Sequence, residues 1–97
     1  MKQCDSLQEV RDEIDKIDTQ LVDLISQRAQ LIRSAAAFKN SVDEVKAQSR
    51  IDAVMQRVRK RAIELNINPN MISDLFKIMI NEMVETEIAE FRNDGKF

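Results

Sequence analysis

The sequence has almost none of the residues that interrupt helices or carry the commonest catalytic chemistry. Its 97 residues include one glycine, one proline and one cysteine, and no histidine, tryptophan or tyrosine. A chain with so few turn-forming residues predicts long helices rather than a sandwich, a barrel or a doubly wound sheet. The lack of histidine excludes a Ser-His-Asp triad and an imidazole metal site, and a single glycine excludes a phosphate-binding loop.

Other absences concern compartment and partners. Cys4 is the only cysteine, so no intrachain disulfide can form, and we expect a reducing, cytoplasmic environment. The first residues lack the apolar core of a signal peptide, and no apolar run is long enough to span a membrane. The formal net charge of −2 gives no overall attraction to nucleic acid. We therefore expect neither a membrane nor a nucleic acid as a partner.

The residues that are present predict amphipathic helices, since 43% are hydrophobic and 33% are charged. Ser6 and Glu9 form a capping-box pattern at the start of a first helix from about Leu7 to Lys39. Its apolar positions alternate in steps of three and four, which is the heptad pattern of a helix-packing seam. They are Leu7, Val10, Ile14, Ile17, Leu21, Leu24, Leu31, Ala35 and Phe38.

Two further helices are predicted. The second carries Ile51, Val54, Met55, Val58, Ala62 and Leu65. Its start is ambiguous, because Ser41 with Glu44 and Ser49 with Asp52 both fit caps; we place a loop at about Asn40 to Gln48.

A turn at about residues 66–68 separates the second helix from the third. Asn68 and Pro69 fit the N-cap and first position of the third helix, and Asn93-Asp94-Gly95 fits its end. Its apolar seam runs Ile72, Leu75, Phe76, Met79, Ile80, Met83, Val84, Ile88 and Phe91. The expected fold is all-α, with one long and two shorter helices in a single domain over residues 1–97.

The length of the first helix predicts an oligomer. A helix of ~33 residues is roughly 50 Å long, whereas a compact domain of this size has a radius of gyration of about 13 Å. Two shorter helices cannot cover such a seam, and an uncovered apolar stripe favours association. We therefore expect an intertwined homodimer.

Charged residues stand at positions where the seams predict apolar ones. Arg28 occupies a heptad core position of the first helix, Lys39 follows on nearly the same face, and Glu87 lies seven residues after Ile80 on the third helix. A buried cation without a counter-charge costs several kcal/mol, so these groups either pair with each other or face a cavity that binds an anion. With Arg11 and Arg50, four cations stand against one seam carboxylate, and this excess favours a pocket for a small dianion.

These residues resemble those of the AroQ-class chorismate mutases over nearly the whole chain. The first helix shows it in Leu7-x-x-Val10-Arg11-x-x-Ile14-Asp15-x-Ile17-Asp18, in Leu21-Val22-x-Leu24-Ile25-x-x-Arg28 and in Ala35-Ala36-Ala37-Phe38-Lys39. Arg50 follows after a loop, and Leu75-Phe76-x-x-Met79-Ile80 with Glu87 resembles the third helix. The order and spacing of the charged residues are more specific than any one motif.

The resemblance implies conversion of chorismate to prephenate by a dimer with two equivalent sites. It implies that Arg28, and Arg11 from the partner chain, bind the substrate carboxylates, while Lys39 and Glu87 flank the ether oxygen. Arg50 would support the carboxylate or the neighbouring residues. The expected catalytic residues are Lys39, Glu87 and Arg28. The expected substrate-binding residues are Arg11, Arg28, Lys39, Arg50, Ile51, Met83 and Glu87. The reaction needs no cofactor or metal, and we expect none.

Some positions resemble a second branch of the family, the isochorismate-pyruvate lyases of salicylate pathways. Phe38-Lys39 after an alanine-rich stretch is similar to them, and Ile51 stands where many mutases have a glutamate that contacts the substrate hydroxyl. Ala47 likewise replaces a polar residue of well-known mutases. Glu87 resembles some mutases, whereas bacterial mutases and the lyases typically have glutamine. We favour the mutase and keep the lyase as the alternative.

Two non-enzymatic hypotheses remain. A helical dimerisation module would tolerate Arg28→Leu, since removing a buried charge is often neutral or stabilising, whereas an enzyme would stay folded and lose turnover. The basic cluster of Arg57, Arg59, Lys60 and Arg61 could bind nucleic acid. Such a run is usually a solvated helix face, and no aromatic residues stand among these cations for base stacking.

Overall fold

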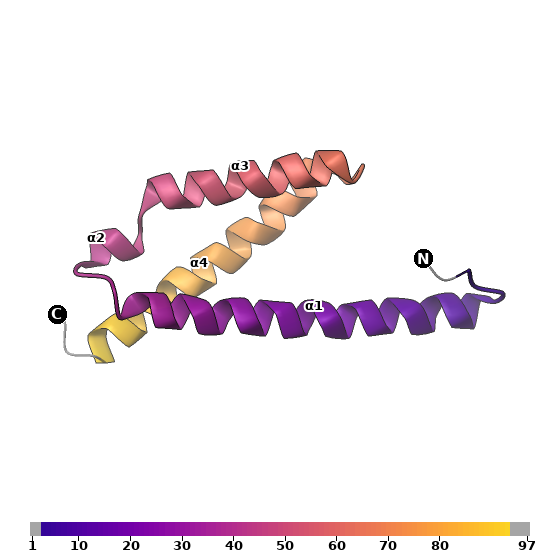
Figure 1. Cartoon of the computed structure of the whole chain (residues 1–97), viewed down its shortest axis with the longest axis horizontal. Helices are drawn as coiled ribbons and strands as arrows, with labels where there is room; N and C mark the ends of the chain where they lie inside the picture. Colours follow the sequence, from indigo (N-terminus) through magenta and orange to yellow (C-terminus); the bar gives the residue numbers. More distant parts are fainter. Residues whose placement is uncertain (1–2, 94–97) are drawn as a thin grey trace. The chain divides into compact units, whose positions relative to one another are not determined.

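The computed structural model describes residues 3–93, and all regular structure in that range is helical. The elements are α1 (Leu7–Ala36), α2 (Val42–Val45), α3 (Gln48–Glu64) and α4 (Pro69–Asn93) (Figure 1). The predicted all-α class, with one long helix and two shorter ones, is confirmed, and α2 is an addition. The chain divides into two compact units, one ending at Leu31 and one beginning at Ile32.

Helix α1 begins where its cap residues predict. The Ser6 hydroxyl accepts the Glu9 backbone N–H at 3.1 Å, and the Glu9 carboxylate accepts the Asp5 N–H at 2.8 Å. The helix ends at Ala36, so the predicted end at Lys39 is wrong by three residues. It closes with bonds to the third preceding carbonyl, from Phe38 N to Ala35 O at 3.0 Å and from Lys39 N to Ala36 O at 3.2 Å.

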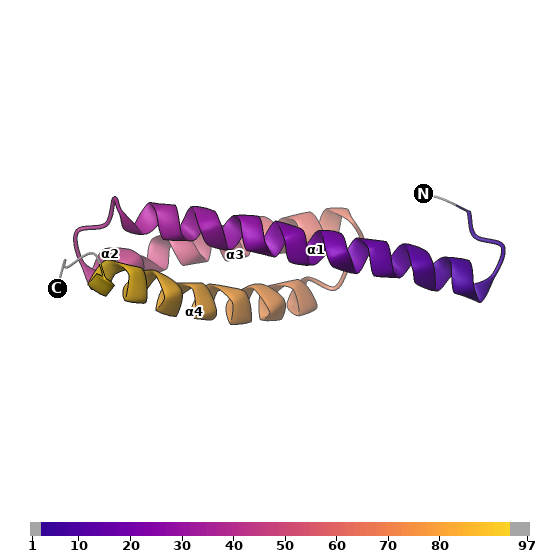
Figure 2. The same ribbon diagram turned by 90° about the horizontal axis from the view of Figure 1, so that it is seen from below.

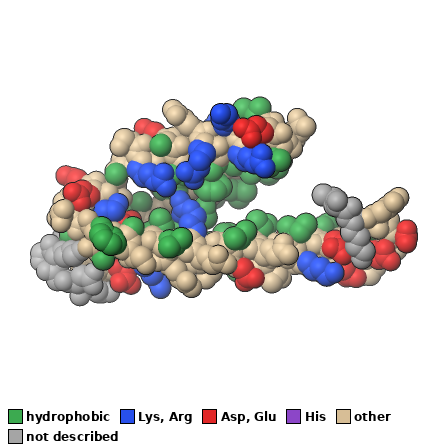
Figure 3. All heavy atoms as spheres, viewed as in Figure 1, with side chains coloured by type: hydrophobic (Ala, Val, Ile, Leu, Met, Phe, Trp, Pro, Cys, Tyr) green, Lys and Arg blue, Asp and Glu red, His purple; other side chains and the backbone are tan. Residues whose placement is uncertain are grey.

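The apolar face of α1 is exposed along its length. Figure 3 shows a row of apolar side chains on this helix. The large apolar residues of α1 with 40% or more of their surface accessible are Leu7, Val10, Ile14, Ile17, Leu21, Val22, Leu24, Ile25 and Leu31. The seam predicted for the first helix therefore exists as an uncovered surface of the single chain.

The segment between α1 and α3 contains a short helix, so the predicted loop at Asn40 to Gln48 is wrong in part. Ser41 is the N-cap of α2, and α3 begins at Gln48 after Ala47, which makes no side-chain cap bond. Ser49 lies inside α3 and is not its cap. Of the two cap patterns predicted near the start of the second helix, only Ser41 with Glu44 acts as a cap.

Helices α3 and α4 form an antiparallel hairpin that meets at the turn after Glu64 (Figures 1 and 2). Asn66 adopts a left-handed conformation with φ of 59°, and the Ile67 N–H bonds back to Ala62 O at 2.9 Å. The Asn66 N–H bonds to Ile63 O at 3.1 Å, which completes a Schellman motif. Asparagine is one of the few residues with a side chain that tolerate this backbone conformation.

The start of α4 confirms a second cap. The Asn68 side chain accepts the Asn70 N–H at 2.9 Å, and Pro69 occupies the first helical position, where no N–H is needed. Helix α4 ends at Asn93, and the predicted end signal at Asp94-Gly95 lies outside the described residues.

The second unit contains the core, which α2, α3 and α4 share with the end of α1. Helix α4 packs against both α3 and α2. The fully buried apolar residues are Ala36, Val45, Val54, Ala62, Ile80, Met83, Ile88 and Phe91. Three of them, Met83, Ile88 and Phe91, lie in the second half of α4, and Ile80 lies just before it.

One member of the basic cluster has a structural role. The Arg59 guanidinium donates to Pro69 O at 3.2 Å, to the Asn70 side chain at 3.1 Å and to the Ser73 hydroxyl at 2.7 Å. It therefore ties α3 to the first turn of α4, and its interpretation as part of a solvated face is wrong. Arg57, Lys60 and Arg61 are exposed on α3, where Figure 3 shows basic side chains.

Candidate active site

Glu87 is the only charged residue buried in the described part of the chain, with 5% of its surface accessible. It lies one turn after Met83 on α4, and Ile88 and Phe91 next to it are buried as well. A carboxyl among buried apolar residues has lost much of its hydration, which disfavours its charged form.

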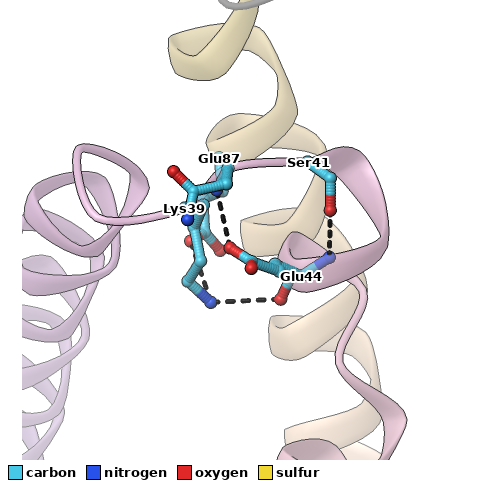
Figure 4. A network of polar contacts seen from close by, with 5 residues as sticks. Lys39, Ser41, Glu44 and Glu87 are labelled. Carbon is cyan, nitrogen blue, oxygen red and sulfur yellow. Dashed lines mark hydrogen bonds and ion pairs between the residues drawn. The ribbon is translucent and has the colours of Figure 1, made fainter.

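Lys39 is the nearest cation to Glu87. Its Nζ lies 3.6 Å from Glu87 Oε1, so the two groups form an ion pair that is slightly too long for a hydrogen bond (Figure 4). The Lys39 side chain is 26% accessible, so the ammonium borders both the buried carboxyl and the surface. The structure therefore brings these two predicted residues together, and their roles in a site stay predictions.

Burial raises the pKa of Glu87 above its ordinary value, and the charge of Lys39 only partly opposes this rise. Glu87 Oε1 is also buried without a hydrogen-bond partner within residues 3–93. A buried polar atom without a partner is rare in proteins and often marks a place where a ligand binds. The pair therefore combines an ammonium with a carboxyl that protonates more readily than usual.

Met83 lies on the same helix as Glu87, one turn before it. It is buried and lies four residues before Glu87, so the two side chains emerge from the same face of α4. An apolar neighbour of this kind helps to keep water from the carboxyl. This placement agrees with Met83 as a wall of the site.

Arg50 and Ile51 lie in the first turn of α3. Arg50 is exposed and makes no ion pair with any residue that the structure describes, and Ile51 is half-buried. Their roles at the site stay predictions.

Arg11 and Arg28 belong to the first unit, where Arg11 is exposed and Arg28 is half-buried on α1. Lys39 and Glu87 belong to the second unit. The expected participation of Arg11 and Arg28 in the same site therefore also stays a prediction.

Glu44, which contacts Lys39, and Ser41, which contacts Glu44, were not predicted as part of the site. Lys39 Nζ donates to the backbone carbonyl of Glu44 at 3.2 Å, and Ser41 caps the short helix that contains Glu44 (Figure 4). The Ser41–Glu44 spacing is visible in the sequence as a cap pattern. The backbone carbonyl that meets the lysine leaves no sequence signal.

Residues 3–93 contain neither a candidate metal site nor a candidate membrane span. That range holds no group of three histidine, cysteine, aspartate or glutamate side chains able to bind a metal ion. Each of its helices is also too short or too polar for a membrane span.

Known proteins share this sequence pattern. The chain matches the family model for chorismate mutase type II over residues 10–88. It is 31% identical over 96 residues to the chorismate mutase of Methanocaldococcus jannaschii, which covers 95% of this chain and 97% of the relative. It is 26% identical over 89 residues to the isochorismate pyruvate lyase of Pseudomonas aeruginosa, which covers 92% of this chain and 88% of the relative.

The chain belongs to the type II chorismate mutase family. The matched range includes Lys39 and Glu87, the two charged residues that meet in the structure. The resemblance drawn from the sequence is therefore confirmed at the level of the family. The two relatives differ in the reaction that their names state.

Proposed function

We propose that the protein is a chorismate mutase, which rearranges chorismate to prephenate. The observation that carries this proposal is the pair of Lys39 and Glu87, an ammonium 3.6 Å from a buried carboxyl whose pKa is raised. The rearrangement breaks an ether C–O bond and forms a C–C bond within one molecule, and negative charge grows on the ether oxygen. Fixed donors that face this oxygen stabilise the transition state more than the substrate.

Lys39 and Glu87 supply these two donors. The ammonium donates to the developing oxyanion, and the protonated carboxyl of Glu87 donates from the other side. A carboxylate has no proton to donate, so burial that raises the pKa of Glu87 favours its catalytic form. The remaining work of the site is to hold the substrate in its folded, reactive conformation.

Cationic side chains hold the two substrate carboxylates. The planar guanidinium of Arg28 and that of Arg11 from the partner suit bidentate contacts with them. Arg50 supports one carboxylate, and Ile51 and Met83 form apolar walls.

The proposal includes a homodimer in which residues 1–97 of each chain act as one domain. The exposed apolar row of α1 supports it, because such a surface in water favours association. A second copy is a suitable occupant, since a face with heptad spacing packs well against an identical face. A cytoplasmic location is also proposed, in keeping with the single cysteine.

The alternative is an isochorismate-pyruvate lyase, which yields salicylate and pyruvate. Ile51 favours it, because an isoleucine cannot hydrogen-bond to the chorismate hydroxyl. The lyase relative from Pseudomonas aeruginosa favours it as well. Glu87 favours the mutase, since its raised pKa suits donation to an ether oxygen on which charge accumulates.

The test is to incubate the purified protein separately with chorismate and with isochorismate. We expect prephenate from chorismate, and an activity that Lys39→Ala abolishes while Lys46→Ala, a matched change of an exposed lysine, preserves. Salicylate and pyruvate from isochorismate, without prephenate from chorismate, would assign the lyase. A folded protein that is inactive on both substrates would favour the hypothesis of a non-catalytic dimerisation module.

A further inference from the structure

Lys39 lies outside any helix, so its own backbone does little to fix its side chain. Helix α1 ends at Ala36, and Lys39 follows in a turn in which its N–H donates to Ala36 O at 3.2 Å. A lysine side chain has four flexible carbons and many rotamers. Other contacts must therefore restrict where the ammonium lies.

One contact that restricts it comes from α2. Lys39 Nζ donates to the backbone carbonyl of Glu44 at 3.2 Å while it lies 3.6 Å from Glu87 Oε1. A hydrogen bond from a charged donor is stronger than one between neutral groups. The ammonium is thus held between one carbonyl on α2 and one carboxyl on α4.

Glu44, whose carbonyl accepts from Lys39, is held by two reciprocal bonds at the start of α2. The Ser41 hydroxyl accepts the Glu44 N–H at 3.2 Å, and the Glu44 carboxylate accepts the Asn40 N–H at 2.6 Å (Figure 4). Val45 next to it is 5% accessible, and α2 packs against α4, the helix that carries Glu87. A helix of four residues has little stability of its own, so these contacts decide whether it forms.

We propose that Ser41 and Glu44 are positioning residues that hold the Lys39 ammonium beside Glu87. They act through Lys39 and do not touch the substrate. The inference rests on the proposed function, because the place of this ammonium affects turnover only if Lys39 acts on the substrate.

The chain offers a matched control at the start of α1. There, Ser6 accepts the Glu9 N–H at 3.1 Å and Glu9 accepts the Asp5 N–H at 2.8 Å, which is the same pair of bonds as at Ser41 and Glu44. Ser6→Ala and Ser41→Ala therefore delete the same cap interaction, one in the first unit and one in the second unit, which contains Lys39.

We expect Ser41→Ala to lower kcat for chorismate about tenfold, with a smaller change in KM, since a small displacement of a catalytic group impairs the chemical step. Ser6→Ala should change kcat by less than about twofold, and Ser41→Thr should restore the cap and most of the activity. Glu44→Ala, which removes the acceptor for the Asn40 N–H, should resemble Ser41→Ala. Circular dichroism checks that each variant is folded.

A second readout does not depend on activity. Loss of the nearby positive charge should move the pKa of Glu87 further up, so the carboxyl carbon of Glu87, followed by NMR, should titrate at higher pH in Ser41→Ala than in the wild type and Ser6→Ala. Equal losses of kcat in Ser41→Ala and Ser6→Ala, or an unchanged Glu87 titration, would overturn the inference. A wild-type protein without activity would overturn the proposed function, and the titration would still decide whether Ser41 holds the ammonium.

Discussion

Glu87 shows how one residue's surroundings set its chemistry. Its α4 neighbours Met83, Ile88 and Phe91 are buried, and the single cation beside it does not cancel the effect of burial on its pKa. A glutamine at this position would donate through its amide at any pH, whereas a glutamate donates only when it is protonated. In the proposed mechanism, the glutamate therefore makes catalysis sensitive to pH.

We expect kcat to fall as the pH rises through the raised pKa of Glu87, because the ionised carboxylate repels the growing charge on the ether oxygen. Glu87→Gln should flatten the profile above the ordinary glutamate pKa. The measurement is kcat for chorismate between about pH 4.5 and 8.5 in both proteins. Profiles of the same shape would remove Glu87 from the role of donor.

The same shift affects stability, with a sign that follows from linkage. The folded chain binds the Glu87 proton more tightly than the unfolded chain, so the free energy of unfolding falls as pH rises from the ordinary glutamate pKa through the raised value. Glu87→Gln lacks this dependence, so the difference between the two proteins in urea denaturation should grow with pH in the variant's favour. A difference that is constant with pH would contradict the shift.

Residue-level reasoning from the sequence found Lys39 and Glu87 because charges at seam positions stand out against an apolar pattern. It did not find the Glu44 carbonyl, because every residue carries one and only the fold decides which carbonyl meets the lysine. Arg59 was misinterpreted for a similar reason. Its partners are a carbonyl and two small polar side chains on the next helix, which no charge pattern reveals.

Among the elements, the α3–α4 turn depends on one residue with an unusual backbone. Asn66 has φ of 59°, where most residues with a Cβ are strained. We expect Asn66→Ala to lower the free energy of unfolding by about 1 kcal/mol and Asn66→Gly to leave it nearly unchanged, because glycine adopts this conformation without strain. Urea denaturation measures both.

Asn81→Ala is a suitable control for this turn, since Asn81 is exposed in the middle of α4, where alanine is a good helix former. It should be neutral or slightly stabilising. If Asn66→Ala behaves like Asn81→Ala, the left-handed residue does not determine the stability of the turn.

Helix boundaries were predictable where side chains cap them. Ser6, Asn68 and Pro69 fix the starts of α1 and α4 through local bonds that the sequence displays. Helix α2 was not predictable, because four residues are too few for a hydrophobic period. Its formation depends on Val45 packing into the core with α4, which is tertiary information.

At the scale of the whole molecule, the proposal that Arg11 acts in the partner's site has a direct test. Arg11→Ala and Lys39→Ala should each be inactive alone. Mixed by joint unfolding and refolding in equal amounts, they should recover about a quarter of the wild-type activity, because half of the dimers then hold one site with both residues intact. Refolding each variant alone is the control.

No recovery in a mixture shown by tagged chains to contain mixed dimers would place Arg11 and Lys39 of one chain in the same site. A protein that sediments as a monomer at every concentration would contradict the dimer itself.

The uncovered apolar row on α1 has a consequence for how the protein comes to be made. If a second copy covers that row, a newly synthesised chain must collide with another before its surface is complete, and maturation becomes a second-order process. The amount of working protein would then rise more steeply than the amount of translated chain when expression is low. Melting temperature would depend on concentration for the same reason.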